Sequence, residues 1–118
     1  MAPPDQLKKL PAAFYQSPNG SEPVRDWLKS LPEQDRKVVG NDIAAAEYGW
    51  PVGMPLCRSL GNGLWEIRSN LLSRRIARVI FCVTRGKMIL LHGFIKKTQK
   101  TQKYDLDLAR RRKTEVES

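Results

Sequence analysis

Arginine and lysine side chains that could bind phosphate are concentrated in residues 63–102. Arg68 ends an alternating segment, and Arg78 lies inside an apolar segment that is rich in β-branched residues. A guanidinium group binds two phosphate oxygens at once and keeps its charge, so arginine suits an anion that gains charge during a reaction. Since an arginine inside an apolar strand otherwise needs a buried partner, Arg78 is the stronger candidate for a functional role.

Two further side chains in this region could move a proton. Glu66 has the same strand parity as Arg68, so it could be a general base or an ion-pair partner that orients Arg68, and we favour the second role. His92 is the only histidine in the chain. Counting back from a hairpin turn at residues 85–86 places His92 on an apolar face with Val79. A hydrogen-bonded core role is expected there, unless the register slips by one residue.

Three apolar segments must position these side chains. Residues 64–68, 76–84 and 88–95 predict strands of one antiparallel sheet, because they alternate in hydropathy or are rich in β-branched residues. A turn at residues 85–86 would set Arg78 opposite Gly93. The sheet would then have a cationic face and an apolar face, and the apolar face needs a cover.

Two helices before the sheet are the expected cover. Residues 21–31 and 32–48 carry apolar side chains at helical spacing, while 12–16 predict a short first strand and 104–113 a terminal helix. We therefore predict an α+β fold, with two N-terminal helices packed on one face of a small antiparallel sheet and a short C-terminal helix. The 118 residues suffice for a single domain over 1–118, with 1–10 and 114–118 expected to be frayed.

The composition narrows the classes of function. The formal net charge is +9, and the excess of positive charge lies in the second half of the chain. That concentration indicates a polyanionic partner, either nucleic acid or an acidic protein. Two cysteines imply no disulfide framework, no run of about 20 apolar residues predicts a membrane span, and no His/Cys cluster has metal-ligand spacing. We expect a cytoplasmic protein that uses no metal or cofactor and binds no membrane.

Four motifs occur in an order that resembles a known superfamily. They are residues 55–60 (PLCRSL), 63–68 (GLWEIR), 78–81 (RVIF) and 91–98 (LHGFIKKT). Together they resemble the RelE/HigB superfamily of toxins from toxin–antitoxin modules, and most closely its phage-derived HigB-like branch. The resemblance implies a ribosome-dependent mRNA endoribonuclease, or mRNA interferase, that inhibits translation without a metal. It also implies an antitoxin partner, a helix-turn-helix protein like HigA, besides the ribosome and mRNA.

The resemblance also assigns roles to positions. Arg68, Arg78 and Lys97 match the residues that hold the scissile phosphate in RelE-type toxins. Tyr104 could stack on a base or anchor the terminal helix. The residues that we expect to contact RNA without chemistry are Arg75, Lys96, Lys100, Lys103 and Tyr104.

Two other functions remain open from the sequence. The superfamily includes ParE-type inhibitors of DNA gyrase on the same fold, and an inactive relative could still bind RNA or its antitoxin. Primer extension on mRNA from induced cells would separate an endoribonuclease from both alternatives, because only the nuclease leaves codon-phased cuts.

Overall fold

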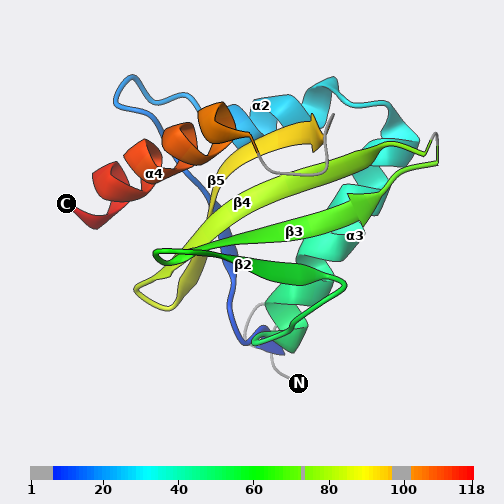
Figure 1. Ribbon diagram of the computed structural model, residues 1–118, viewed down its shortest axis with the longest axis horizontal. Coiled ribbons are helices and arrows are strands. Elements are labelled where there is room, and N and C mark those ends of the chain that lie inside the picture. The colour runs from blue at the N-terminus through cyan, green and yellow to red at the C-terminus, as the bar shows by residue number, and fades with distance from the viewer. Residues whose placement is uncertain (1–6, 73, 97–101) are drawn as a thin grey trace.

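Figure 1 shows a computed structural model of the chain, which describes residues 7–72, 74–96 and 102–118. The described elements are β1 (Ala12–Phe14), α2 (Pro23–Ser30), α3 (Glu33–Gly49), β2 (Cys57–Gly61), β3 (Leu64–Asn70), β4 (Ile76–Thr84), β5 (Lys87–Lys96) and α4 (Lys103–Glu117). The five strands form one sheet in the order β1-β5-β4-β3-β2. The α+β class and the three predicted central strands are confirmed.

The sheet differs from the prediction at both of its edges. β1 pairs with β5 in parallel, so the sheet is mixed and not purely antiparallel. β2 is an additional strand that pairs antiparallel with β3, in a segment for which we predicted no strand. Parallel strands need a long connection, and here α2, α3 and strands β2 to β4 all lie between β1 and β5 in the chain.

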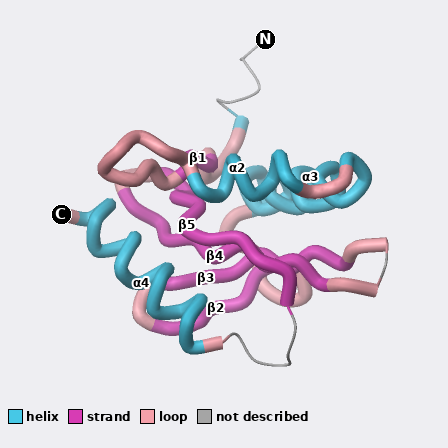
Figure 2. The backbone as a smooth tube through the Cα atoms, turned by 90° about the horizontal axis from the view of Figure 1, so that it is seen from above, coloured by secondary structure: helices cyan, strands magenta, loops and turns pink. Residues whose placement is uncertain are grey.

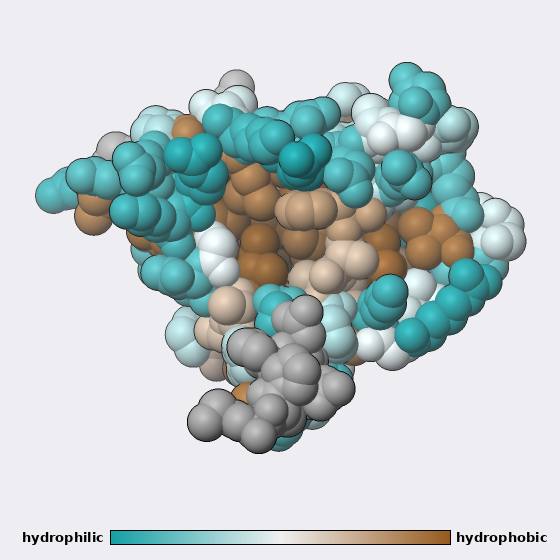
Figure 3. Space-filling model, turned by 180° about the vertical axis from the view of Figure 1, so that it is seen from behind, coloured by the Kyte–Doolittle hydropathy of each residue, from teal (hydrophilic) through white to brown (hydrophobic). Residues whose placement is uncertain are grey.

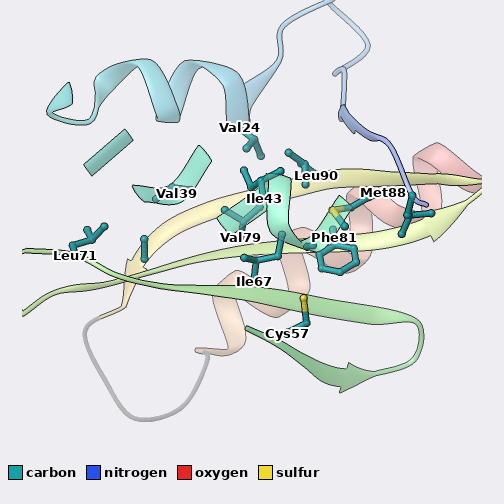
Figure 4. Close-up of a cluster of buried hydrophobic side chains, with 13 residues drawn as sticks. Val24, Val39, Ile43, Cys57, Ile67, Leu71, Val79, Phe81, Met88 and Leu90 are labelled. Atoms are coloured by element: carbon teal, nitrogen blue, oxygen red, sulfur yellow. The ribbon is translucent and has the colours of Figure 1, made fainter. Parts of the chain in front are cut away.

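The two N-terminal helices cover one face of the sheet, as predicted (Figure 2). α2 begins with Pro23, whose fixed φ suits the first turn of a helix, and α3 runs for 17 residues to Gly49. Apolar side chains of both helices meet those of the strands in the core shown in Figure 4. The labelled core residues are Val24, Val39, Ile43, Cys57, Ile67, Leu71, Val79, Phe81, Met88 and Leu90.

This helical face is not completely filled. Seen from behind, apolar side chains line a hollow that is surrounded by polar groups (Figure 3). A hollow of about 280 Å³ lies between β1, α2 and α3, with Ala12, Leu28 and Ile43 in its wall. Gly40 of α3 also lines it, and a Cβ atom at this position would meet nothing within 4 Å.

The C-terminal helix packs on the opposite face of the sheet (Figure 2). α4 continues to Glu117, beyond residue 113, where we predicted the helix to end. Its packing partners on the sheet form a second apolar cluster, which includes Ile80 and Leu91 together with Ala109 of the helix. The sheet is therefore enclosed on both sides at this end, whereas the prediction left the cationic face open.

A β-bulge in β5 changes the predicted register. Val83 lies opposite Met88, as a turn at residues 85–86 predicts, but the pairing shifts between Ile80 and Phe81. Leu91 is the extra residue, so Leu91 and His92 both lie on the α4 side. Beyond the bulge Arg78 is opposite Phe94 and not Gly93.

The bulge moves Gly93 to the helical face, whereas the prediction placed it on the cationic face beside Arg78. Ile95 also lies on the helical face, and Phe94 lies on the other. Gly93 lies directly beneath Trp27 of α2, because a Cβ atom there would be 2.4 Å from the ring atom Cε3. Glycine is therefore required at this contact.

Candidate functional site

Four cations surround one carboxylate on the sheet face opposite α2 and α3. The register pairs Arg58 of β2 with Glu66 of β3, and Arg68 of β3 with Arg78 of β4. Directly opposed residues share a face, and Lys96 at the end of β5 is close enough for its charge to interact with the other three cations and with Glu66. We call these five residues the cation cluster. The prediction that Arg68 and Arg78 share a cationic face with Glu66 is confirmed.

Glu66 and Arg78 form the buried centre of the cation cluster. Both side chains are fully buried, and Arg78 Nη1 donates a hydrogen bond to Glu66 Oε1. The same oxygen lies 3.5 Å from Nε of Arg58, whose side chain is 42% exposed. The predicted pairing of Glu66 with Arg68 does not occur among the described residues. Glu66 instead joins strands β2, β3 and β4 through two other arginines.

Two polar atoms of Arg78 are left without partners. Nε and Nη2 are buried and form no hydrogen bond with the described residues. Loss of solvent lowers the pKa of Arg78, while the charge of Glu66 opposes that change. Buried donors are nearly always satisfied in folded proteins, so these two atoms are an exception within the cation cluster.

Arg68 and Lys96 have no ion pair with a carboxylate in the part of the chain that the structure describes. Arg68 lies directly opposite Arg78, and its side chain forms no hydrogen bond with the described residues. Like charges at opposed strand positions destabilise a sheet, so this arrangement has a cost. Desolvation, followed by the charges of Arg78 and Arg68, lowers the pKa of Lys96. Four cations around one carboxylate favour the binding of an anion.

His92 lies on the α4 face and not beneath the helical cover, so its predicted position is wrong. The bulge at Leu91 is the reason. Its Nε2 is 2.6 Å from Oδ1 of Asp105, in the first turn of α4, and its ring stacks on Phe94 with 5.2 Å between centroids. Burial lowers the pKa of His92, and Asp105 opposes that effect. His92 does form a hydrogen bond, but on the other face of the sheet from the one predicted, where the bond fastens β5 to α4.

Further contacts hold α4 in place. Arg112 Nη1 donates a hydrogen bond of 2.8 Å to the carbonyl oxygen of Leu91, at the bulge. The Arg112 guanidinium also lies over the ring of Tyr15, 5.2 Å from its centroid, and the Tyr15 hydroxyl donates a hydrogen bond to Glu115. The basic run at 110–113 therefore includes at least one arginine whose contacts are structural.

The other residues that we predicted to contact RNA lie outside the cation cluster or outside the described residues. Arg75 Nη2 forms a 2.5 Å ion pair with Asp35 of α3, so it links the start of β4 to the helical cover. Lys103 and Tyr104 are exposed at the start of α4, and Tyr104 is 71% exposed. Lys97 and Lys100 lie outside the described residues.

Arg58 was not predicted as a site residue. It lies in the PLCRSL motif, but its role depends on the pairing of β2 with β3. A signal was present in the sequence, because a strand at 57–61 that pairs with 64–70 opposes Arg58 to Glu66 or to a neighbour of Glu66. Within residues 7–72, 74–96 and 102–118, no three His, Cys, Asp or Glu side chains gather in a way that could hold a metal ion. No helix in this same part of the chain is long and apolar enough to cross a membrane.

The fold and the cation cluster define a small α+β protein with a concentration of positive charge on its central sheet. The sequence profile of a family described as "Phage derived protein Gp49-like (DUF891)" matches residues 26–114, which is most of the chain. The chain belongs to this family, which is associated with the toxins of toxin–antitoxin systems. A search of curated proteins finds no match.

Proposed function

We propose that this protein is the toxin of a type II toxin–antitoxin system, from the HigB-like branch, and that it cuts translated mRNA on the ribosome. The observation that carries the proposal is the cation cluster, in which four cations share the single carboxylate of Glu66. An RNA phosphate supplies negative charge that balances these cations. The Gp49-like family membership supports the same class.

The proposed reaction is attack of a ribose 2′-hydroxyl on the adjacent phosphate, which releases the 5′-oxygen of the next nucleotide. Negative charge accumulates on the non-bridging oxygens in the transition state, where fixed guanidinium groups are most effective. Arg68 and Arg78 would stabilise this charge. Lys96, which we expected to contact RNA without chemistry, would add its charge to that of the arginines.

Glu66 and His92 support this site by positioning other groups. Glu66 is fully buried and bound by Arg78 and Arg58, so its role as their counter-ion is favoured over that of a general base. His92 is engaged with Asp105 beneath α4. The partners that follow from the proposal are the ribosome with its mRNA and a helix-turn-helix antitoxin that neutralises the toxin in the cytoplasm.

Induced expression in a bacterial host tests this function. The wild-type chain should arrest growth, and primer extension on cellular mRNA should show cuts in phase with codons. Arg68→Gln should remove both effects, because it removes a cation that would stabilise the transition state. The Arg68 side chain has no hydrogen bond or ion pair with the described residues, so the substitution should leave the fold intact. Arg85→Gln, an exposed arginine in the β4–β5 turn, is the matched control and should behave as wild type.

Growth arrest with intact mRNA would contradict the proposal and would favour the gyrase inhibitor. Full activity of the Arg68→Gln variant would remove the cation cluster as the site.

A further inference from the structure

Arg58 differs from the other arginine that binds Glu66. It lies on β2, which is an edge strand, directly opposite Glu66. Its side chain is 42% exposed, whereas that of Arg78 is fully buried. Both arginines contact the same oxygen, Oε1 of Glu66, so Arg58 lies at the solvent side of the pair.

The contact of Arg58 with Glu66 is the weaker of the two. Nε of Arg58 is 3.5 Å from Oε1, which is too long for a strong charge-assisted hydrogen bond. Exposed ion pairs contribute little to stability, because water competes for both charges. The two Nη atoms of Arg58 have no hydrogen bond or ion pair with the described residues, so its bidentate edge is available.

We propose that Arg58 is an additional phosphate ligand for RNA, held on Glu66 until RNA binds. This inference rests on the proposed function, since it names a ligand for the same substrate. An RNA phosphate accepts two hydrogen bonds from the free edge of Arg58, a geometry that a single carboxylate oxygen at 3.5 Å does not provide. Glu66 keeps Arg78 as its partner throughout, so the exchange leaves no buried charge without compensation.

Salt dependence of RNA binding tests the proposal without requiring cleavage. The purified full chain is titrated into a fluorescent single-stranded RNA with 2′-O-methyl groups, which cannot be cut, at several salt concentrations. Each phosphate contact on a single strand contributes about 0.7 to the slope of log K against log salt. Arg58→Gln should make the slope less steep by about 0.7 than that of Arg85→Gln. Arg85→Gln is the control, because it removes the same charge in the turn that follows β4.

A conservative variant distinguishes a role of Arg58 as an RNA ligand from a role in holding Glu66. Arg58→Lys keeps the charge but loses the bidentate edge, so the slope should return while affinity stays below that of the wild type. A role confined to holding Glu66 predicts a lower melting temperature for Arg58→Gln with an unchanged slope.

Equal slopes for Arg58→Gln and Arg85→Gln would overturn the inference, and so would absence of salt-dependent RNA binding by the wild-type chain. Neither result would overturn the proposed function, which takes place on the ribosome and is tested separately by primer extension on cellular mRNA.

Discussion

The buried pair of Glu66 and Arg78 allows a quantitative prediction about stability. Arg78→Met removes the cation and leaves the carboxylate of Glu66 inside the protein, where its contact with the exposed Arg58 compensates only in part. Removal of one partner from a buried ion pair costs about 3–5 kcal/mol. We expect the lower end of this range, about 3 kcal/mol, because Arg58 remains.

That loss is large for a domain of this size. Single domains have a free energy of unfolding of about 5–15 kcal/mol, and 1 kcal/mol shifts the melting temperature of a domain of about 100 residues by roughly 4 °C. Arg78→Met should therefore lower the melting temperature by about 12 °C. Urea unfolding followed by circular dichroism and tryptophan fluorescence gives the free energy directly. Lys87→Met, at an exposed position, is the control and should change it by less than about 0.5 kcal/mol.

The double variant Arg78→Met/Glu66→Leu separates the buried pair from the rest of the fold. Replacing both partners with apolar residues of similar volume is often neutral or stabilising, so the double variant should regain most of the lost stability. It should still fail to cut RNA, because it lacks the Arg78 guanidinium that would stabilise the transition state. A loss below about 1 kcal/mol for the single variant, or equal instability of the single and double variants, would refute the reasoning.

Three further predictions follow from other contacts. Gly93→Ala should cost about 1–3 kcal/mol in urea unfolding, because the new Cβ would be 2.4 Å from Trp27, and an unchanged midpoint would refute that contact. Burial lowers the pKa of His92, so the unfolded chain binds the proton more readily and stability should fall as the pH drops below about 6.5. A His92→Gln variant should flatten that dependence. Burial raises the pKa of Cys57 and of Cys82 to about 11, so both thiols should react with a thiol reagent at pH 8 only after unfolding, and fast reaction of the folded chain would contradict this.

The sheet and its helical cover could be predicted because apolar residues recur at the period of a strand or of a helix in each segment. The alternation in β3 and the β-branched residues of β4 assign their side chains to the correct faces of the sheet. Arg68 and Arg78 were therefore correctly predicted to share a face. The turn at residues 85–86 gave the correct start of the hairpin, with Val83 opposite Met88.

The bulge could not be predicted because both neighbouring leucines are equally apolar. Leu90 packs beneath the helices and Leu91 packs against α4, so each core accepts its leucine and hydropathy does not reveal the extra residue. One unseen residue reversed the faces assigned to His92 and Gly93. Arg58 was missed for a related reason, since its role depends on the pairing of a strand that follows a proline-rich loop.

Cleavage of ribosome-bound mRNA in vitro tests the central claim most directly. The purified chain is added to ribosomes programmed with an mRNA that carries a single 2′-deoxy substitution at the position where the unmodified mRNA is cut. We predict that the unmodified mRNA is cut there, that the 2′-deoxy mRNA survives, and that Arg68→Gln cuts neither. Equal cutting of both mRNAs, or undiminished cutting by Arg68→Gln, would contradict 2′-hydroxyl attack at the cation cluster.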